Sequence, residues 1–146
     1  MDKLLEEVAA EKQLINATLE ELQKILQRDR IEFVEMAAMA TCLLNFYNGV
    51  ENLFKRALGF LQVPLPTSPT SHRDLLELVV EHRIISQQLS ETLDEYRAFR
   101  HYFVHGYGIL LQEAPLKSLC ENLASIWQNF EDEFGRFLSS QGNLKN

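Results

Sequence analysis

Apolar residues recur at steps of three and four along nearly the whole chain, and this spacing limits the folds that the chain can adopt. The pattern is clearest over residues 2–28, where charged residues fill the gaps and neither glycine nor proline interrupts. Such spacing places apolar side chains on one face of an α-helix. No segment shows the sustained two-residue alternation of a half-buried strand. The sequence therefore predicts an all-α fold.

Breaks in this pattern divide the chain into about five predicted helices. The first spans 2–28, and after the charged joint 28–30 the second spans 32–61. Three prolines within 63–71 force a surface loop, which Ser71 ends as the N-cap of a third helix over 72–84. Ser86 or Ser90 caps the fourth helix. Pro115 suits the first turn of a fifth helix that runs to about 139. The polar tail from Gln141 is expected to fray. We expect one domain over 1–146, an up-and-down helical bundle.

Composition narrows the class of protein. A chain of 146 residues with 46% hydrophobic residues can bury a sizeable core, and a net charge of −7 argues against a protein that coats nucleic acid. Cys42 and Cys120 lie within apolar patterns, so we expect buried free thiols in a reducing compartment. Because no apolar run is long enough for a membrane span, a cytoplasmic protein is expected.

Chemistry-bearing residues crowd into 97–108. Arg100, His105 and Tyr107 form the pattern Arg-x4-His-x-Tyr, and Arg97 and His101 lie among them. An arginine can stabilise charge on a phosphoryl group, and a histidine can transfer protons near neutral pH. His101 and His105 could share a zinc ion, but no third ligand is obvious, and no carboxylate cluster suits magnesium. We therefore expect no metal and no cofactor.

The spacing of this motif predicts a dimer. In a straight helix, residues five apart differ by about 140° in direction, so Arg100 and His105 diverge, whereas Arg100 and Tyr107 share a face. One chain alone would not focus Arg100 and His105 on one phosphate. A two-fold dimer that apposes two such helices would bring one chain's histidine near the other's arginine.

A second polar group lies in the second predicted helix. Asn48, Glu51 and Asn52 share one face, and Tyr47 flanks it. Polar groups within an apolar helix need partners when buried. The favoured interpretation is a hydrogen-bond network between helices; the alternative is a direct role beside the active site.

Three stretches together resemble a HEPN domain of the HepT type, the ribonuclease toxin of bacterial and archaeal toxin–antitoxin pairs. They are Arg100-x4-His105-x-Tyr107, residues 47–51 and residues 71–76. The resemblance implies a composite site between two protomers and a partner nucleotidyltransferase that attaches AMP to Tyr107. The residue after the motif arginine is often Asn or Asp in such domains; here His101 keeps the polarity and changes the chemistry.

The favoured function is a metal-independent endoribonuclease toxin that acts on mRNA or tRNA. RNA supplies its own nucleophile, the 2′-hydroxyl. His105 would transfer the proton, Arg100 would hold the phosphate, and His101 would supply the second proton or bind phosphate. Tyr47, Asn48, Glu51 and Arg97 would support the site. Two alternatives are a non-catalytic HEPN module that binds, or is modified by, a nucleotidyltransferase, and a plain helical adaptor.

Overall fold

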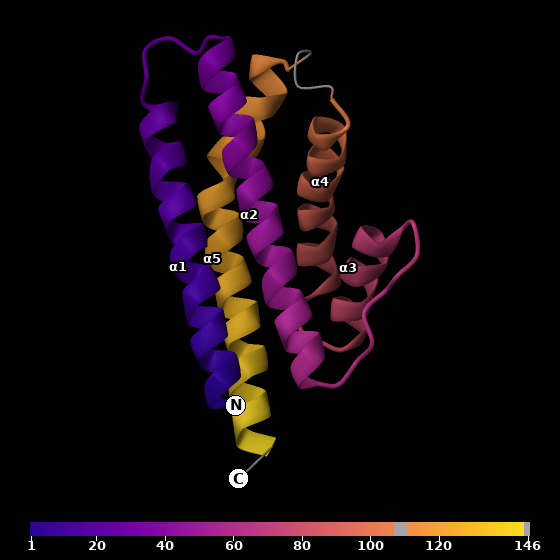
Figure 1. Ribbon diagram of the computed structural model, residues 1–146. Helices are drawn as coiled ribbons and strands as arrows, with labels where there is room; N and C mark the ends of the chain where they lie inside the picture. Colours follow the sequence, from indigo (N-terminus) through magenta and orange to yellow (C-terminus); the bar gives the residue numbers. More distant parts are fainter. Residues whose placement is uncertain (107–110, 145–146) are drawn as a thin grey trace.

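The computed structural model describes residues 1–106 and 111–144, and within these ranges it contains five α-helices and no strand (Figure 1). The helices are α1 (Asp2–Leu26), α2 (Phe33–Phe60), α3 (Ser71–Glu81), α4 (Gln87–Val104) and α5 (Glu113–Leu144). The predicted all-α fold of five helices is therefore confirmed.

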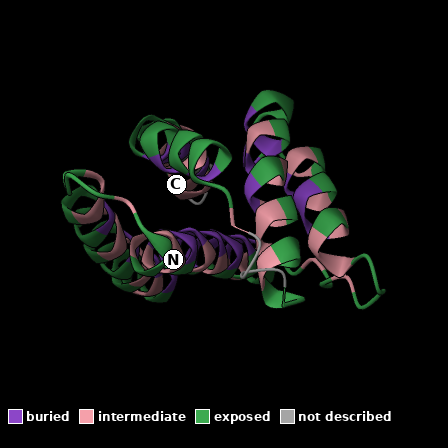
Figure 2. Cartoon of the chain, turned by 90° about the horizontal axis from the view of Figure 1, so that it is seen from above, coloured by how far each residue is buried: buried purple, intermediate pink, exposed green. Residues whose placement is uncertain are grey.

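The four long helices lie side by side, and the short α3 packs on the side of α4 that faces away from α1 (Figure 1). α1 packs mainly against α2, and α4 contacts both α2 and α5. The loop before α3 returns along the side of the bundle, so α3 starts near the middle of α4 (Figure 1). Buried faces turn toward the inside of the bundle and exposed faces outward (Figure 2), as amphipathic helices require.

Aromatic side chains from three helices form the centre of the core. The ring of Phe46 on α2 meets Tyr96 of α4 edge-on at 5.8 Å between centroids and Trp127 of α5 at 6.1 Å. The polar tips of two of these rings find partners: Trp127 Nε1 donates to Asn16 Oδ1 at 2.9 Å, and the Tyr96 hydroxyl donates to the Leu119 carbonyl at 2.7 Å. These bonds tie α5 to α1 and to α4.

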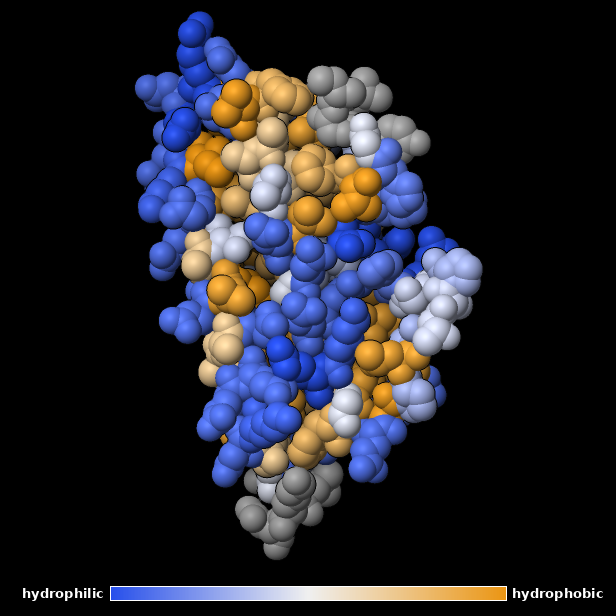
Figure 3. All heavy atoms as spheres, in the orientation of Figure 1, coloured by the Kyte–Doolittle hydropathy of each residue, from blue (hydrophilic) through white to orange (hydrophobic). Residues whose placement is uncertain are grey.

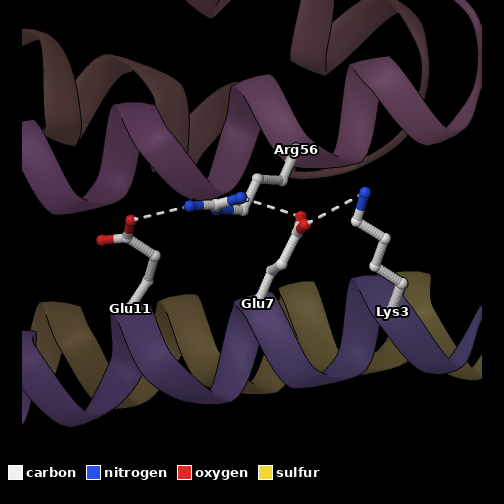
Figure 4. A network of polar contacts seen from close by, with 4 residues as sticks. All are labelled: Lys3, Glu7, Glu11 and Arg56. Atoms are coloured by element: carbon white, nitrogen blue, oxygen red, sulfur yellow. Dashed lines mark hydrogen bonds and ion pairs between the residues drawn. The ribbon is translucent and has the colours of Figure 1, made fainter.

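The α1–α2 contact combines a close backbone approach with an ionic clamp. A Cβ at Gly49 would lie 2.7 Å from Cγ1 of Ile15, so only glycine lets the two helices come this near. About two turns after Gly49 along α2, Arg56 lies between Glu7 and Glu11, with N–O distances of 2.8 and 3.3 Å (Figure 4). The register of α1 on α2 is thus set at two points.

Two helix starts show how local chemistry decides boundaries. The predicted Ser71 cap of the third helix is wrong by one residue, because α3 begins at Ser71 and Thr70 is its N-cap. The hydroxyls of Ser68 and Thr70 donate to the Asp74 carboxylate, which organises the turn before the helix. At α4, Ser86 is the cap and its Oγ accepts from the backbone N–H of the third residue of the helix.

The C-terminal helix is longer than its sequence predicts. A frayed tail was expected from Gln141, yet α5 continues to Leu144. Its apolar face stays in the core through the buried Phe134 and Phe137, which hold the last turns in place.

Two further predictions concern burial and membranes. Cys42 and Cys120 are both buried and free, as expected. Burial raises the pKa of the Cys120 thiol to about 12 and also raises that of Cys42. None of the described helices is long and apolar enough to cross a membrane.

Candidate functional site

Arg100 projects from the second half of α4 and is held by α2. Its Nε donates to Oδ1 of Asn48 at 2.7 Å, across the α2–α4 contact. Arg100 is half-buried and forms no ion pair with a described carboxylate. A guanidinium that is oriented by an amide but not neutralised keeps its charge and its terminal N–H groups for an anionic ligand.

His105 lies at the C-cap of α4, where its orientation is fixed by the backbone. Its Nδ1 lies 2.7 Å from the carbonyl oxygen of His101. A carbonyl can only accept, so Nδ1 carries the proton and Nε2 of the neutral ring is left with its lone pair. The side chain is exposed, and the His101 ring lies 4.0 Å away between centroids. This is the tautomer that a general base needs.

The helix ends inside the motif. α4 stops at Val104, and Gly106 has a φ of +88°, a left-handed conformation that favours glycine. The backbone therefore turns at Gly106, directly after the end of the helix. His105 is the C-cap residue and its backbone N–H still bonds the His101 carbonyl, so the divergence expected between Arg100 and His105 stays a prediction. Tyr107 lies outside the described residues.

Glu51 of α2 forms the centre of a polar contact between helices. Its side chain is 4% exposed, and Oε2 lies 2.7 Å from Nδ1 of His72 on α3. With the Asn48–Arg100 bond, this pair confirms the predicted interhelical network. Asn52, which was expected on the same face, is exposed. Tyr47 is the exception among the buried members, because its hydroxyl makes no hydrogen bond with a described residue.

The electrostatics of this network keep the phenol neutral and the arginine charged. Burial, followed by the negative charge of Glu51, raises the pKa of Tyr47 far above its usual range. Arg97 of α4 is mostly buried and donates to Asp94 one turn earlier. This hydrogen bond raises the pKa of Arg97 despite the cost of burial. The cation of Arg97 is therefore secure next to Tyr47 and Glu51.

A pocket of about 330 Å³ opens between the start of α3 and the second half of α4. Its lining is rich in basic side chains and comprises Pro69, Thr70, His72, Arg73, Arg97, Ala98 and His101. His101 belongs both to this pocket and to the contact with His105, so the pocket adjoins the motif.

The structure thus brings some predicted residues together and adds others. Asn48 meets Arg100, and His101 meets His105, whereas Glu51 pairs with a residue that the sequence did not single out as functional. His72 lies in the first turn of α3, next to the N-cap Thr70. The signal that could have found it is the need of a buried glutamate for a partner. Among the described residues, no three His, Cys, Asp or Glu side chains are grouped closely enough to hold a metal ion.

Comparison with known protein families gives one match. Residues 38–141 match the family described as HepT-like protein, so the chain belongs to the HepT-like family. The resemblance seen in the motifs is thereby confirmed. The matched range includes the Asn48–Arg100 bond, the Glu51–His72 pair and the whole motif from Arg100 to Tyr107. No curated protein and no solved structure gives a significant match.

Proposed function

We propose that the chain is a metal-independent endoribonuclease toxin whose site is built from Arg100, His105 and His101. The observation that carries this proposal is that the second half of α4 and its C-cap present both an unneutralised Arg100, oriented by Asn48, and a His105 whose Nε2 is free. Membership of the HepT-like family supports it, because HepT-type proteins are associated with ribonuclease toxins. A plain adaptor has no need of a histidine held in one tautomer.

The reaction follows from these groups. His105 Nε2 takes the proton of the RNA 2′-hydroxyl, and the 2′-oxygen attacks the neighbouring phosphorus. Arg100 donates to the phosphoryl oxygens, where charge builds up in the transition state. The P–O5′ bond breaks, and an imidazolium donates its proton to the leaving O5′, a role for His101 or for a histidine of a second protomer. The products are a 2′,3′-cyclic phosphate and a 5′-hydroxyl.

An apolar area at one end of the bundle supports a homodimer. Apolar atoms gather over the upper half of α2 and toward the upper part of α4 (Figure 3), where α2 starts and α4 ends. Val34 is 72% exposed, and Phe33 and Val104 are each 49% exposed. Exposure of several large apolar residues at one end is unfavourable in a monomer, so a second copy of the chain is the occupant we propose. Such a dimer would bring two α4 ends, each with Arg100 and His105, close together.

We expect the wild type to sediment as a dimer at micromolar concentration and Val34→Asp to sediment as a monomer, because a carboxylate in the apolar contact would lose its hydration. Leu65→Asp is the matched control, since this exposed leucine lies in the loop before α3. A wild-type monomer at that concentration would overturn the dimer.

A mixing experiment tests whether the dimer shares its site. Arg100→Ala and His105→Ala proteins, each inactive alone, are refolded together. If each site combines Arg100 of one protomer with His105 of the other, mixed dimers regain one intact site, so the mixture should recover about a quarter of wild-type activity. No recovery would place both residues of a site in one chain.

The proposed antitoxin is a small nucleotidyltransferase that attaches AMP to Tyr107. A phosphate fixed to Tyr107, two residues after His105, would place negative charge where the RNA phosphate must bind. We expect Tyr107→Phe to keep cutting RNA but to escape inhibition when the two proteins are co-expressed. Intact mass should show added AMP on the wild type and none on the variant. Inhibition without a mass change would mean control by binding alone.

A further inference from the structure

Apart from His101, the residues that line the basic pocket between α3 and α4 take no part in the reaction proposed above, yet the lining has the properties of an anion site. Four of its lining residues are arginine or histidine: His72, Arg73, Arg97 and His101. Three described carboxylates lie close by: Glu51 is engaged with His72, Asp94 with Arg97, and Asp74 accepts from the hydroxyls of Ser68 and Thr70. The pocket is therefore lined by donors whose charges are only partly balanced.

His72 is held in one orientation by a buried carboxylate. Glu51 is fully inside the fold, and its hydrogen bond to Nδ1 leaves the other ring nitrogen of His72, Nε2, available. The His72 side chain is 44% exposed and lines the pocket. Because a carboxylate can only accept, Nδ1 of His72 donates to Glu51, and Nε2 is the remaining polar atom of a ring whose orientation is fixed.

Arg73 and Arg97 complete the donor set from two helices. Arg73, in the first turn of α3, is exposed and forms no ion pair with a described residue. The Arg97 side chain is only 15% exposed and is fixed by Asp94. The N-terminus of α3 borders the same pocket at Thr70, and the helix dipole adds to the positive potential there.

The pocket is continuous with the proposed catalytic end through His101. This residue lines the pocket, and its ring also lies 4.0 Å from that of His105. An RNA strand whose scissile phosphate lies at Arg100 and His105 would carry its neighbouring phosphate past His101.

We propose that this pocket binds the RNA backbone phosphate next to the scissile one, through Arg73, Arg97 and His72 oriented by Glu51. The inference rests on the proposed ribonuclease function and extends it by a second phosphate subsite. The subsite favours substrates with at least two phosphates, and it positions the strand without taking part in proton transfer. Arg73 is then a binding residue for the substrate, and Glu51 is a positioning residue.

The test compares Arg73→Gln with wild type on three substrates: a dinucleoside monophosphate, which has only the scissile phosphate, and the same molecule with an added 5′- or 3′-phosphate. For one of the two phosphorylated substrates we expect kcat/KM of Arg73→Gln to be about tenfold lower than that of wild type, because one charged hydrogen-bond donor is lost. The change should appear as a higher KM, with kcat unchanged. The unphosphorylated substrate should be cut equally by both proteins. Arg136→Gln is the matched control, because it makes the same charge change on the exposed side of α5. Equal effects of Arg73→Gln on all three substrates would overturn the subsite.

A binding measurement tests the subsite independently of the proposed catalysis. A 2′-O-methyl trinucleotide cannot be cut, and we expect its affinity to fall about tenfold in Arg73→Gln and to stay unchanged in Arg136→Gln. If the wild type cuts no RNA but the trinucleotide shows this loss, the ribonuclease proposal fails and the subsite stands. Inorganic phosphate distinguishes the source of the anion. If it binds as tightly as the trinucleotide, the pocket is a site for a free anion and the RNA subsite is wrong.

Discussion

His105→Ala is expected to lower kcat for RNA cleavage by about 10²–10⁴-fold, the usual contribution of a general base. The variant should keep the wild-type melting temperature, because the His105 side chain is exposed at the end of α4 and its one hydrogen bond is local. Initial rates on a fluorescent single-stranded RNA and a thermal melt measure the two quantities. His82→Ala is the control histidine, at the C-cap of α3.

A loss of cleavage in His82→Ala as large as in His105→Ala would indicate damage to the fold. Cleavage that survives His105→Ala would remove this residue from the site. His101→Ala is the graded case, and we expect a partial loss because His105 of a second protomer could supply the same proton.

Arg100→Ala is expected to lower kcat by about 10²–10³-fold, the cost of removing one donor to the transition-state charge. Arg100→Lys should recover only part of this loss, since an ammonium lacks the planar fork that binds a phosphate bidentately. A lysine also lacks the Nε through which Asn48 orients Arg100. Measuring kcat for wild type, Arg100→Lys and Arg100→Ala on the same RNA tests whether the rates fall in that order.

Asn48→Ala separates the contribution of the Arg100 charge from that of the Arg100 orientation. It leaves the Arg100 guanidinium in place but removes its 2.7 Å hydrogen bond to α2. We expect a smaller loss than in Arg100→Ala, with Arg100→Ala/Asn48→Ala no worse than Arg100→Ala alone. Additive losses would mean that Asn48 acts independently of Arg100.

The helices were predictable because each depends on local sequence. The spacing of apolar residues and the breaks at the prolines and at Ser86 mark elements that the structure contains. Boundaries were less predictable, since they depend on which group caps a turn: Thr70 rather than Ser71 precedes α3. α5 also runs past Gln141 to Leu144, where the polar tail has no apolar spacing that would predict a helix.

The candidate site was predictable in part. The motif indicated Arg100 and His105 as residue types suited to phosphate chemistry, but the contacts that orient them depend on the fold. The partner of Arg100 is 52 residues away in the sequence, and that of Glu51 is 21 residues away. The contact of His105 Nδ1 with the His101 carbonyl, which leaves Nε2 free, is a side-chain orientation that the spacing of the motif does not specify.

The most direct test of the central claim is RNA cleavage by the purified chain in excess EDTA. The proposed reaction uses only side chains, so wild type should cut single-stranded RNA at the same rate with and without the chelator. The products should end in a 2′,3′-cyclic phosphate and a 5′-hydroxyl, which mass spectrometry distinguishes. Cleavage that stops in EDTA and returns with magnesium, or products that carry a 5′-phosphate, would contradict the account.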